Sequence, residues 1–480
     1  MKKNNLFKVI GIVILGYIAL TWIVPIVASI CGETESLSYQ VGFVSGGLKL
    51  VETFSGFGTS LVFILLVGGF YAILEATGRY EKSLRLIVDK MKGKEKTFLI
   101  AIMVLMAIIS SVTGLDLALL ILFPFVISLI LMMGYDKMVA LCATFGATII
   151  GMYGATYAST LYGVNNSMLG TSLSGEILAK VILFVLGLGL LIAFVLMYIK
   201  KTDVSKSNSS KKEDRKTVKV KVKKEVEEVT TGNKKYVWPI YVVLGLLFLV
   251  FILGTTSWGG IFGSNFFSGI HEKIMGWKIK GFAPVETIFG GMTAFGTWSD
   301  PTRFQYYSLL LIFASVILCL FYKINASDTF EAFIKGVKEY TVPAFLALLA
   351  YFVFVLTYYF PILSYLTSLI GKLSSSFNVA VTGVNALISS FFYSDFYYYA
   401  YYVIYSAVSV LEDSSVLELV SIIYTNIYAL VMLVAPTSVL LLTSLSITEV
   451  SYKTWFKFIW KLFLSLLIVS FIVFIIMLAI

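Results

Sequence analysis

The sequence predicts an all-α integral membrane protein made of two related halves with inverted topology. Hydrophobic residues make up 59% of its 480 residues and charged residues only 13%, whereas globular proteins are about half apolar and a quarter charged. One spacing of two serines and an aspartate also occurs twice, at Ser110, Ser111 and Asp116 and at Ser389, Ser390 and Asp395. Such repeats are typical of transporters whose two halves meet near the bilayer midplane.

Apolar runs long enough to cross a bilayer, about 17 to 25 residues, predict nine transmembrane helices. They begin near Phe7, Ser60, Met138, Leu173, Tyr236, Phe304, Val342, Val416 and Trp460. Two further runs predict re-entrant hairpins at 97–133 and 378–411. The first run has 37 residues, nearly twice what one crossing needs at about 1.5 Å per residue. We therefore expect it to fold back at Thr113 and Gly114.

A charged segment at 200–235 separates the N-terminal half (1–199) from the C-terminal half (236–480). It carries thirteen Lys or Arg and six Asp or Glu, with almost no apolar periodicity, which predicts a solvated linker. Because basic loops mark the cytoplasmic side, we expect the N-terminus and this linker in the cytoplasm of a multi-pass cell-membrane protein.

The amphipathic segments of the two halves differ in charge. Residues 79–96 carry seven Lys or Arg, whereas their counterpart at 361–377 carries only Lys372. This asymmetry is what opposite orientations of the two halves require.

The sequence lacks the motifs that are typical of metal-binding proteins and of several enzyme classes. One histidine, His271, and three separated cysteines, Cys31, Cys142 and Cys319, give no metal-ligand spacing. The sequence contains neither a P-loop nor a nucleophile elbow. We therefore predict no enzymatic activity, no metal and no cofactor, with Na⁺ or H⁺ as the expected coupling ion. The net charge of +10 is concentrated in the linker, so the expected partners are lipids and a small molecule, not nucleic acid.

The hairpin tips are the first place to expect a ligand, because non-helical backbone at membrane depth must face protein or water. Carboxylate and hydroxyl oxygens there suit Na⁺, and the amides of a helix N-terminus suit a substrate carboxylate. Tip one offers Ser110, Ser111, Thr113 and Asp116, and tip two offers Ser389, Ser390, Ser394 and Asp395.

The two tip aspartates have different structural alternatives. Thr113 and Asp116 form a T-x-x-D pattern, so Asp116 either caps a helix or binds a ligand. Asp395 lacks such a capping partner, and a cation would account for a carboxylate at that depth.

Two of the predicted spans contain interruptions. The span predicted from Met138 is interrupted at Gly154, Thr156, Ser159 and Thr160, and the span predicted from Val416 at Pro436, Thr437 and Ser438. A proline removes an amide and frees a carbonyl near Met432, which can bind an ion or substrate. A plain kink is the alternative, because Ser and Thr also join helices by hydrogen bonds.

Tyrosines crowd the outgoing arm of the second hairpin. They either form an interfacial aromatic belt or face a cavity with Asp395, where they would favour a cationic substrate. The residues are Tyr393, Tyr397, Tyr398, Tyr399, Tyr401, Tyr402 and Tyr405.

Several short strings along nearly the whole chain resemble one family. The strings include Gly68–Phe70, Gly134–Asp136, Asp328–Phe330, Ala435–Ser438 and Tyr452–Phe458. In them the chain resembles the YfcC-like carriers, relatives of anaerobic dicarboxylate carriers and of arginine/ornithine antiporters in the ion transporter superfamily. The resemblance implies secondary transport of a small carboxylate or amino acid, and a homodimer.

The chain departs from these relatives at both tips. Leu117 and Ala118 stand where relatives carry paired glutamates, and Phe391 to Phe396 where they are rich in Ser and Gly. We predict a secondary active transporter of a carboxylate-bearing solute that works by alternating access. A basic amino acid is the favoured substrate, because a dicarboxylate would need positive residues near the tips. The alternatives are a C4-dicarboxylate carrier and a non-transporting sensor or assembly protein.

Overall fold

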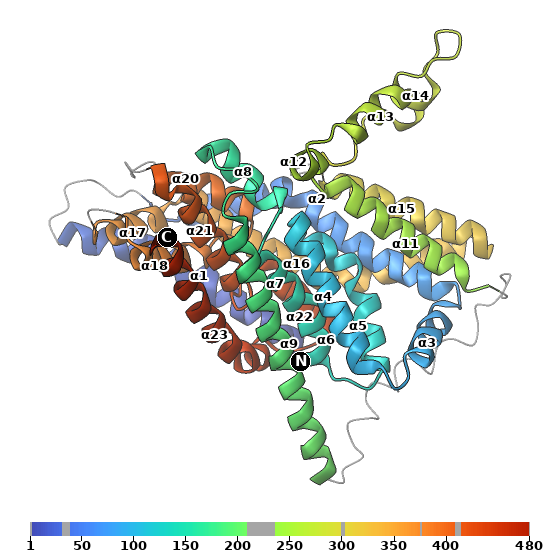
Figure 1. Ribbon diagram of the computed structural model, residues 1–480, viewed down its shortest axis with the longest axis horizontal. Helices are drawn as coiled ribbons and strands as arrows, with labels where there is room; N and C mark the ends of the chain where they lie inside the picture. The colour runs from blue at the N-terminus through green and yellow to red at the C-terminus, as the bar shows by residue number, and fades with distance from the viewer. Residues whose placement is uncertain are drawn as a thin grey trace.

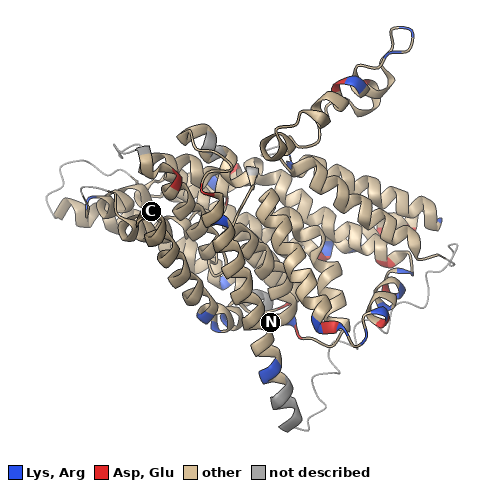
Figure 2. Ribbon diagram, in the orientation of Figure 1, with Lys and Arg blue, Asp and Glu red and all other residues tan. Residues whose placement is uncertain are grey.

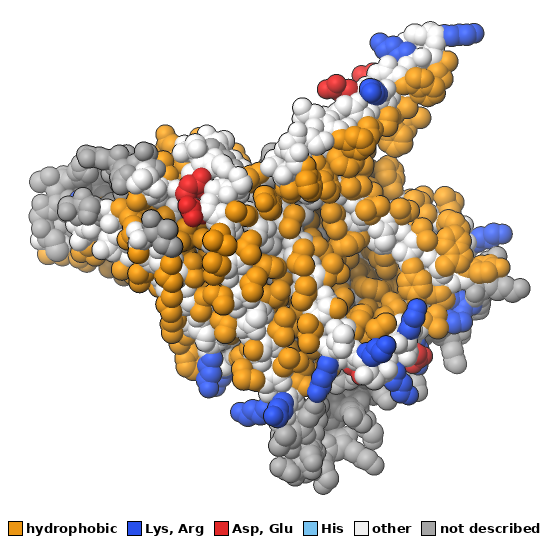
Figure 3. All heavy atoms as spheres, viewed as in Figure 1, with side chains coloured by type: hydrophobic (Ala, Val, Ile, Leu, Met, Phe, Trp, Pro, Cys, Tyr) orange, Lys and Arg blue, Asp and Glu red, His pale blue; other side chains and the backbone are white. Residues whose placement is uncertain are grey.

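The all-α membrane fold predicted from composition is confirmed (Figure 1). The computed structural model describes residues 2–30, 39–208, 236–298, 303–374, 377–408 and 414–479, so most of the predicted 200–235 linker lies outside the described residues. Apolar side chains cover much of the surface seen in Figure 3. Eight described helices are long and apolar enough to cross a membrane: α1 (Lys2–Ile30), α2 (Phe43–Ala76), α4 (Glu95–Thr113), α9 (Ile177–Asn208), α11 (Trp238–Thr255), α15 (Arg303–Tyr322), α16 (Ala326–Tyr359) and α23 (Tyr452–Ala479).

The count of eight differs from the nine predicted spans for a definite reason. Seven predicted spans are long helices and α4 is the eighth, whereas the spans predicted from Met138 and Val416 are each divided into shorter helices. The first division falls at Gly154 and the second at Pro436, where interruptions were predicted. The pieces are α6 (Lys137–Leu141), η2 (Cys142–Gly146), α7 (Ala147–Tyr153) and α8 (Ser159–Leu169), and α21 (Leu417–Met432) and α22 (Val439–Thr448).

Both predicted hairpins contain a helix break near their middle. α4 ends at Thr113, and Gly114 has a left-handed backbone with φ +71°, a conformation that favours glycine. The chain continues as η1 (Leu117–Ile121) and α5 (Phe123–Met132). The second hairpin consists of α18 (Val379–Ser390), α19 (Phe396–Tyr399), η3 (Ala400–Ile404) and α20 (Tyr405–Val408), and its last predicted residues, 409–411, lie outside the described residues.

The same order of elements occurs in both halves. A long helix is followed by an amphipathic helix, a hairpin, a broken span and a final span. The amphipathic helices are α3 (Tyr80–Lys90) and α17 (Ile362–Gly371). Lys and Arg gather at the end of the molecule that carries α3, the start of α4 and the end of α9 (Figure 2). The half boundaries and the inverted orientation of the two units stay predictions.

The longest helices, α2 and α16, cross with their backbones in contact. A side-chain carbon at Gly68 would collide with the Gly336 carbonyl, one at Gly336 would collide with the Gly68 carbonyl, and one at Gly69 would collide with the ring of Phe333. Farther along, the rings of Phe57 and Tyr351 stack with centroids 4.1 Å apart. Small residues permit this close approach, which is a main source of helix association in membranes.

A buried polar network joins the two broken spans to the last helix. Tyr153 ends α7, and its carbonyl accepts a 2.7 Å hydrogen bond from Asn426 Nδ2 on α21. The Ser470 hydroxyl on α23 lies 2.7 Å from Asn426 Oδ1 and 2.9 Å from the Tyr153 hydroxyl. The network therefore gives the end of α7 a partner that its own helix cannot supply.

Replacing Ser470 by alanine should weaken this network. Asn426 Oδ1 would lose a buried donor, at a cost of about 1 kcal/mol in the free energy of unfolding. The apparent melting temperature of the purified protein in detergent should fall. Ser465→Ala on the same helix is the control, because that exposed hydroxyl bonds only the carbonyl of Lys461 among the described residues. Equal melting temperatures for the two variants would contradict a stabilising role of the network.

Candidate functional site

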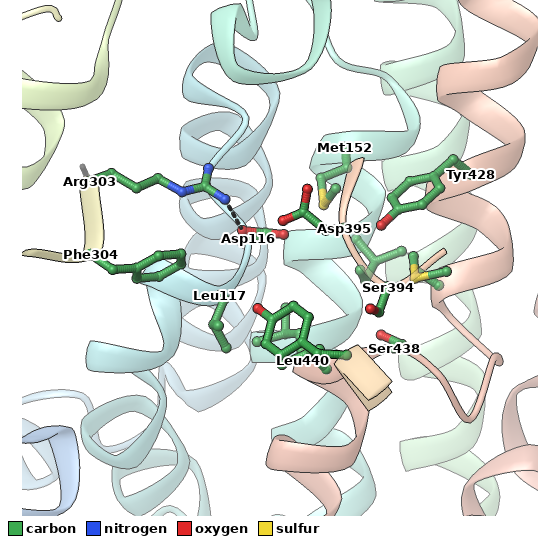
Figure 4. Close-up of a pocket in the computed structure, with 14 residues that line it drawn as sticks. Asp116, Leu117, Met152, Arg303, Phe304, Ser394, Asp395, Tyr428, Ser438 and Leu440 are labelled. Carbon is green, nitrogen blue, oxygen red and sulfur yellow. Dashed lines mark ion pairs between the residues drawn. The ribbon is translucent and has the colours of Figure 1, made fainter. Parts of the chain in front are cut away.

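Both hairpin tips line a small cavity inside the membrane part of the molecule (Figure 4). Its free volume is about 20 Å³, which suffices for roughly one water molecule. One wall comes from Arg303 and Phe304 at the start of α15 and from Tyr351 on α16. The facing residues come from the tips and the broken spans: Asp116, Leu117, Ile149, Met152, Ser394, Asp395, Tyr428, Met432, Ser438, Val439 and Leu440.

An ion pair lies across this cavity. Arg303 Nη2 is 3.8 Å from Asp116 Oδ1, and the Arg303 side chain is 6% exposed. Asp116 Oδ1 accepts no hydrogen bond from the described residues. This distance is longer than the roughly 2.7–2.9 Å of a charge-assisted hydrogen bond. A competing carboxylate could therefore engage the same guanidinium. Asp116 and Asp395 direct their carboxylates into the same space (Figure 4).

Arg303 was not predicted from the sequence. An arginine beside an apolar run is typical of an interfacial anchor, so its position alone does not indicate a ligand site. A signal was present, because Arg303 is the only basic residue between Lys280 and Lys323. Tyr351 and Tyr428 were also missed, since nothing in their spacing separates them from other buried aromatic residues.

Tip one is fastened to the first broken span. The Ser111 hydroxyl donates to the Gly154 carbonyl at 2.7 Å and lies 3.2 Å from the Thr156 hydroxyl. The Thr156 amide donates to the Ser111 carbonyl at 2.9 Å, and the Thr160 hydroxyl donates to the Thr113 carbonyl at 3.0 Å. These side chains hold Asp116 in position without lining the cavity.

Tip two is fastened from within the hairpin and from the second broken span. Ser389 and Ser390 lie 3.2 and 2.9 Å from the hydroxyl of buried Tyr399. The Thr437 hydroxyl donates to the Phe391 carbonyl. Ser438 both lines the cavity and caps α22, because its hydroxyl accepts from the Leu441 amide at 3.3 Å.

The capping expectations for the two aspartates are reversed. Asp116 makes no side-chain cap, since the Thr113 hydroxyl instead bonds the Ile109 carbonyl and the Leu115 amide. Asp395, which was expected to lack a capping partner, accepts from the Tyr398 amide at 3.4 Å. The capping alternative for Asp116 is therefore wrong, and its carboxylate faces Arg303.

The predicted site residues divide into two groups. The structure brings four into the cavity: Asp116, Ser394, Asp395 and Ser438. The Ser394 hydroxyl, like Asp116 Oδ1, has no hydrogen-bond partner among the described residues, so both are available to a water, an ion or a ligand in the cavity. The side chain of Ser159 lies outside what the structure describes. The rest are buried but do not line the cavity: Ser110, Ser111, Thr113, Thr156, Ser389, Ser390, Pro436 and Thr437.

The tyrosines of the second hairpin do not line the cavity either. Tyr393 and Tyr399 are buried in packing contacts, whereas Tyr397, Tyr401 and Tyr405 are exposed. The exposed positions fit the aromatic belt better than the cation-binding alternative. The aromatic rings in the described cavity lining are instead those of Phe304, Tyr351 and Tyr428.

Comparison with known proteins identifies the family. Residues 46–479 match the family model described as C4-dicarboxylate anaerobic carrier (DcuC). An uncharacterized protein of Haemophilus influenzae is 26% identical over 171 residues, and this match covers 36% of the chain and 34% of that relative. The chain thus spans about a third of that relative's length. Neither the family description nor the name of this relative mentions the YfcC-like carriers, so that finer assignment is not confirmed.

The family description agrees with the expectation of a membrane carrier rather than an enzyme. It gives no support to an amino-acid substrate and agrees with the dicarboxylate alternative. Because its model covers most of the sequence, the chain belongs to the DcuC family of C4-dicarboxylate anaerobic carriers.

Proposed function

We propose that the protein is a secondary active transporter that carries a C4-dicarboxylate through the cavity between Asp116, Arg303 and Asp395. The observation that carries this proposal is the buried guanidinium of Arg303, which faces the hairpin tips. Arginine offers a planar fork of donors that matches a carboxylate in two parallel hydrogen bonds. The family description supports the same substrate class.

Arg303 also changes the argument for an amino-acid substrate. That prediction depended on the lack of positive residues near the tips and on tyrosine rings beside Asp395. Arg303 lies beside tip one, and the hairpin tyrosines do not line the cavity. A second carboxylate of the substrate would have nearby donors in Ser394 and Ser438.

Charge balance supports coupling to cations. The cavity contains two carboxylates and one guanidinium, so its formal charge is −2 + 1 = −1. A dianionic substrate would bring the total to −3. Charges at membrane depth are costly unless paired, so cations must accompany the substrate, and the oxygens of Asp116, Asp395, Ser394 and Ser438 suit Na⁺.

The size of the cavity supports alternating access. Free space of about 20 Å³ is far too small for a four-carbon diacid, so the substrate can enter only after the walls separate.

The predicted homodimer and the cytoplasmic location of the N-terminus and of residues 200–235 are part of this proposal.

Replacing Arg303 by glutamine should reduce succinate binding by the detergent-purified protein about ten- to hundredfold, because one charge-assisted contact contributes about 1.5–3 kcal/mol. Arg303→Lys should retain part of the affinity. Isothermal titration would measure this, with melting temperature and size-exclusion profile as checks of folding.

The matched control is Arg85→Gln, because Arg85 is exposed, pairs with Glu81 and does not line the cavity. Full succinate affinity in a folded Arg303→Gln variant would contradict the proposed substrate contact. Tight binding of arginine or ornithine in place of succinate would restore the amino-acid alternative.

Asp395→Asn and Asp116→Asn should each raise, by at least about tenfold, the Na⁺ or H⁺ concentration that half-saturates succinate uptake, since each removes one anionic ligand of the coupling cation. Uptake of labelled succinate into proteoliposomes under separate Na⁺ and pH gradients would measure this. Glu81→Gln, an exposed carboxylate change, should leave uptake unaltered. If the parent protein took up no succinate under either gradient, the non-transporting alternative would gain support.

A further inference from the structure

A segment between α11 and α15 extends away from the helix bundle (Figure 1). It comprises residues 258–290 and is called the arm below. Its helices are α12 (Trp258–Phe262), α13 (Phe266–Met275) and α14 (Pro284–Phe289), and a short bridge pairs Ile279 with Phe282. None of the three helices has a buried residue. The base of the arm contacts the rest of the chain, because Gly260 lies against Leu173 and the ring of Phe267 lies 6.1 Å from that of Phe295, but the side chains of its helices stay accessible.

The arm is nevertheless apolar on one side. Phe266, Ile270 and Ile274 recur every four residues along α13, and Trp277 continues the same stripe. Phe266 is 62% exposed, Ile274 50% and Trp277 54%. Hydrophobic side chains gather along the underside of the arm in Figure 3, and its charged side chains lie on the upper side and at the tip. An apolar stripe of this kind marks an interaction surface.

The charges around the stripe are those of a membrane-surface segment. Lys278 and Lys280 flank the exposed tip residue Ile279, and Lys273 borders the stripe on α13. Segments that lie on a membrane combine Trp, Phe and Ile on one face with lysines that reach the lipid phosphates. Glu272 lies on the side of α13 opposite the stripe, where it would face water.

The position of the arm gives it access to the bilayer. It begins at the end of α11 and returns to the start of α15, two helices with many exposed apolar side chains such as Leu246 and Val316. In Figure 3 the apolar underside of the arm continues into the apolar surface of these helices. Both surfaces thus border the region that lipid occupies around the bundle.

We propose that the arm lies in the headgroup region of the leaflet opposite the basic loops, with its apolar stripe toward the acyl chains and its lysines on lipid phosphates. The arm anchors the ends of α11 and α15, and with them Arg303, at a fixed depth in the membrane. The occupant of the stripe is lipid and not a second protein. This inference does not depend on the identity of the transported solute.

Spin labels on opposite faces of α13 test the proposal. The labels are placed at Ile274→Cys and, as the matched control, at Glu272→Cys in the full-length protein with Cys31, Cys142 and Cys319 replaced by alanine. The protein is reconstituted in nanodiscs of phosphatidylcholine and phosphatidylglycerol. Collision of the label with oxygen, which enriches in lipid, is compared with collision with a water-soluble nickel complex.

The label at 274 should collide several-fold more with oxygen than with nickel, and the label at 272 should show the reverse. Replacing Lys273, Lys278 and Lys280 by glutamine should move the label at 274 toward water. Equal nickel access at both positions would place the arm in water and overturn the proposal. Spin–spin broadening between labels at 274 would mean that a second copy covers the stripe, and would also overturn it.

A second measurement keeps the native cysteines. The contribution of Trp277 to the tryptophan fluorescence is the difference between the parent protein and the Trp277→Phe variant. Phospholipids brominated near the headgroup should quench most of that contribution in reconstituted protein. If brominated lipids left it unquenched while they quenched the remaining tryptophans, the arm would not lie on the membrane.

Discussion

A helix that stops inside a membrane leaves carbonyl groups without partners, and the structure around the cavity depends on how they are satisfied. Ser111 donates to the Gly154 carbonyl, Asn426 to the Tyr153 carbonyl and Thr437 to the Phe391 carbonyl. Each donor belongs to a different segment from its acceptor. The broken spans and the tips therefore hold one another in place, and removal of one donor leaves a distant segment with an unpaired carbonyl.

The charges of the cavity are divided between two structural units. Arg303 begins α15, which packs on α2 through Phe304 and Phe63, whose ring centroids are 5.4 Å apart. Asp116 and Asp395 belong to the tips. In the proposed cycle a substrate carboxylate displaces Asp116 from Arg303, and a cation then neutralises the released aspartate. Anion and cation binding would thereby favour each other, which is the thermodynamic condition for coupled transport.

Much of the fold could be predicted from the sequence, because run length and helix-breaking residues act locally. The long apolar runs, Gly114 and Pro436 set where helices lie and end. The site was less predictable, since the use of a hydroxyl depends on the segment that packs against it. The Ser111 hydroxyl donates to the Gly154 carbonyl, whereas Ser394 lines the cavity. Arg303 was missed because its partner Asp116 lies 187 positions earlier in the chain.

The contact of Gly68 with Gly336 has a mechanical consequence. With no side chain between the two backbones, α2 and α16 are in direct backbone contact, and we expect the two helices to move as one unit. α15 is packed on α2 and carries Arg303 with this rigid pair. A carrier built in this way would keep its anion-binding charge stationary while the barrier to either side of the membrane moves around it.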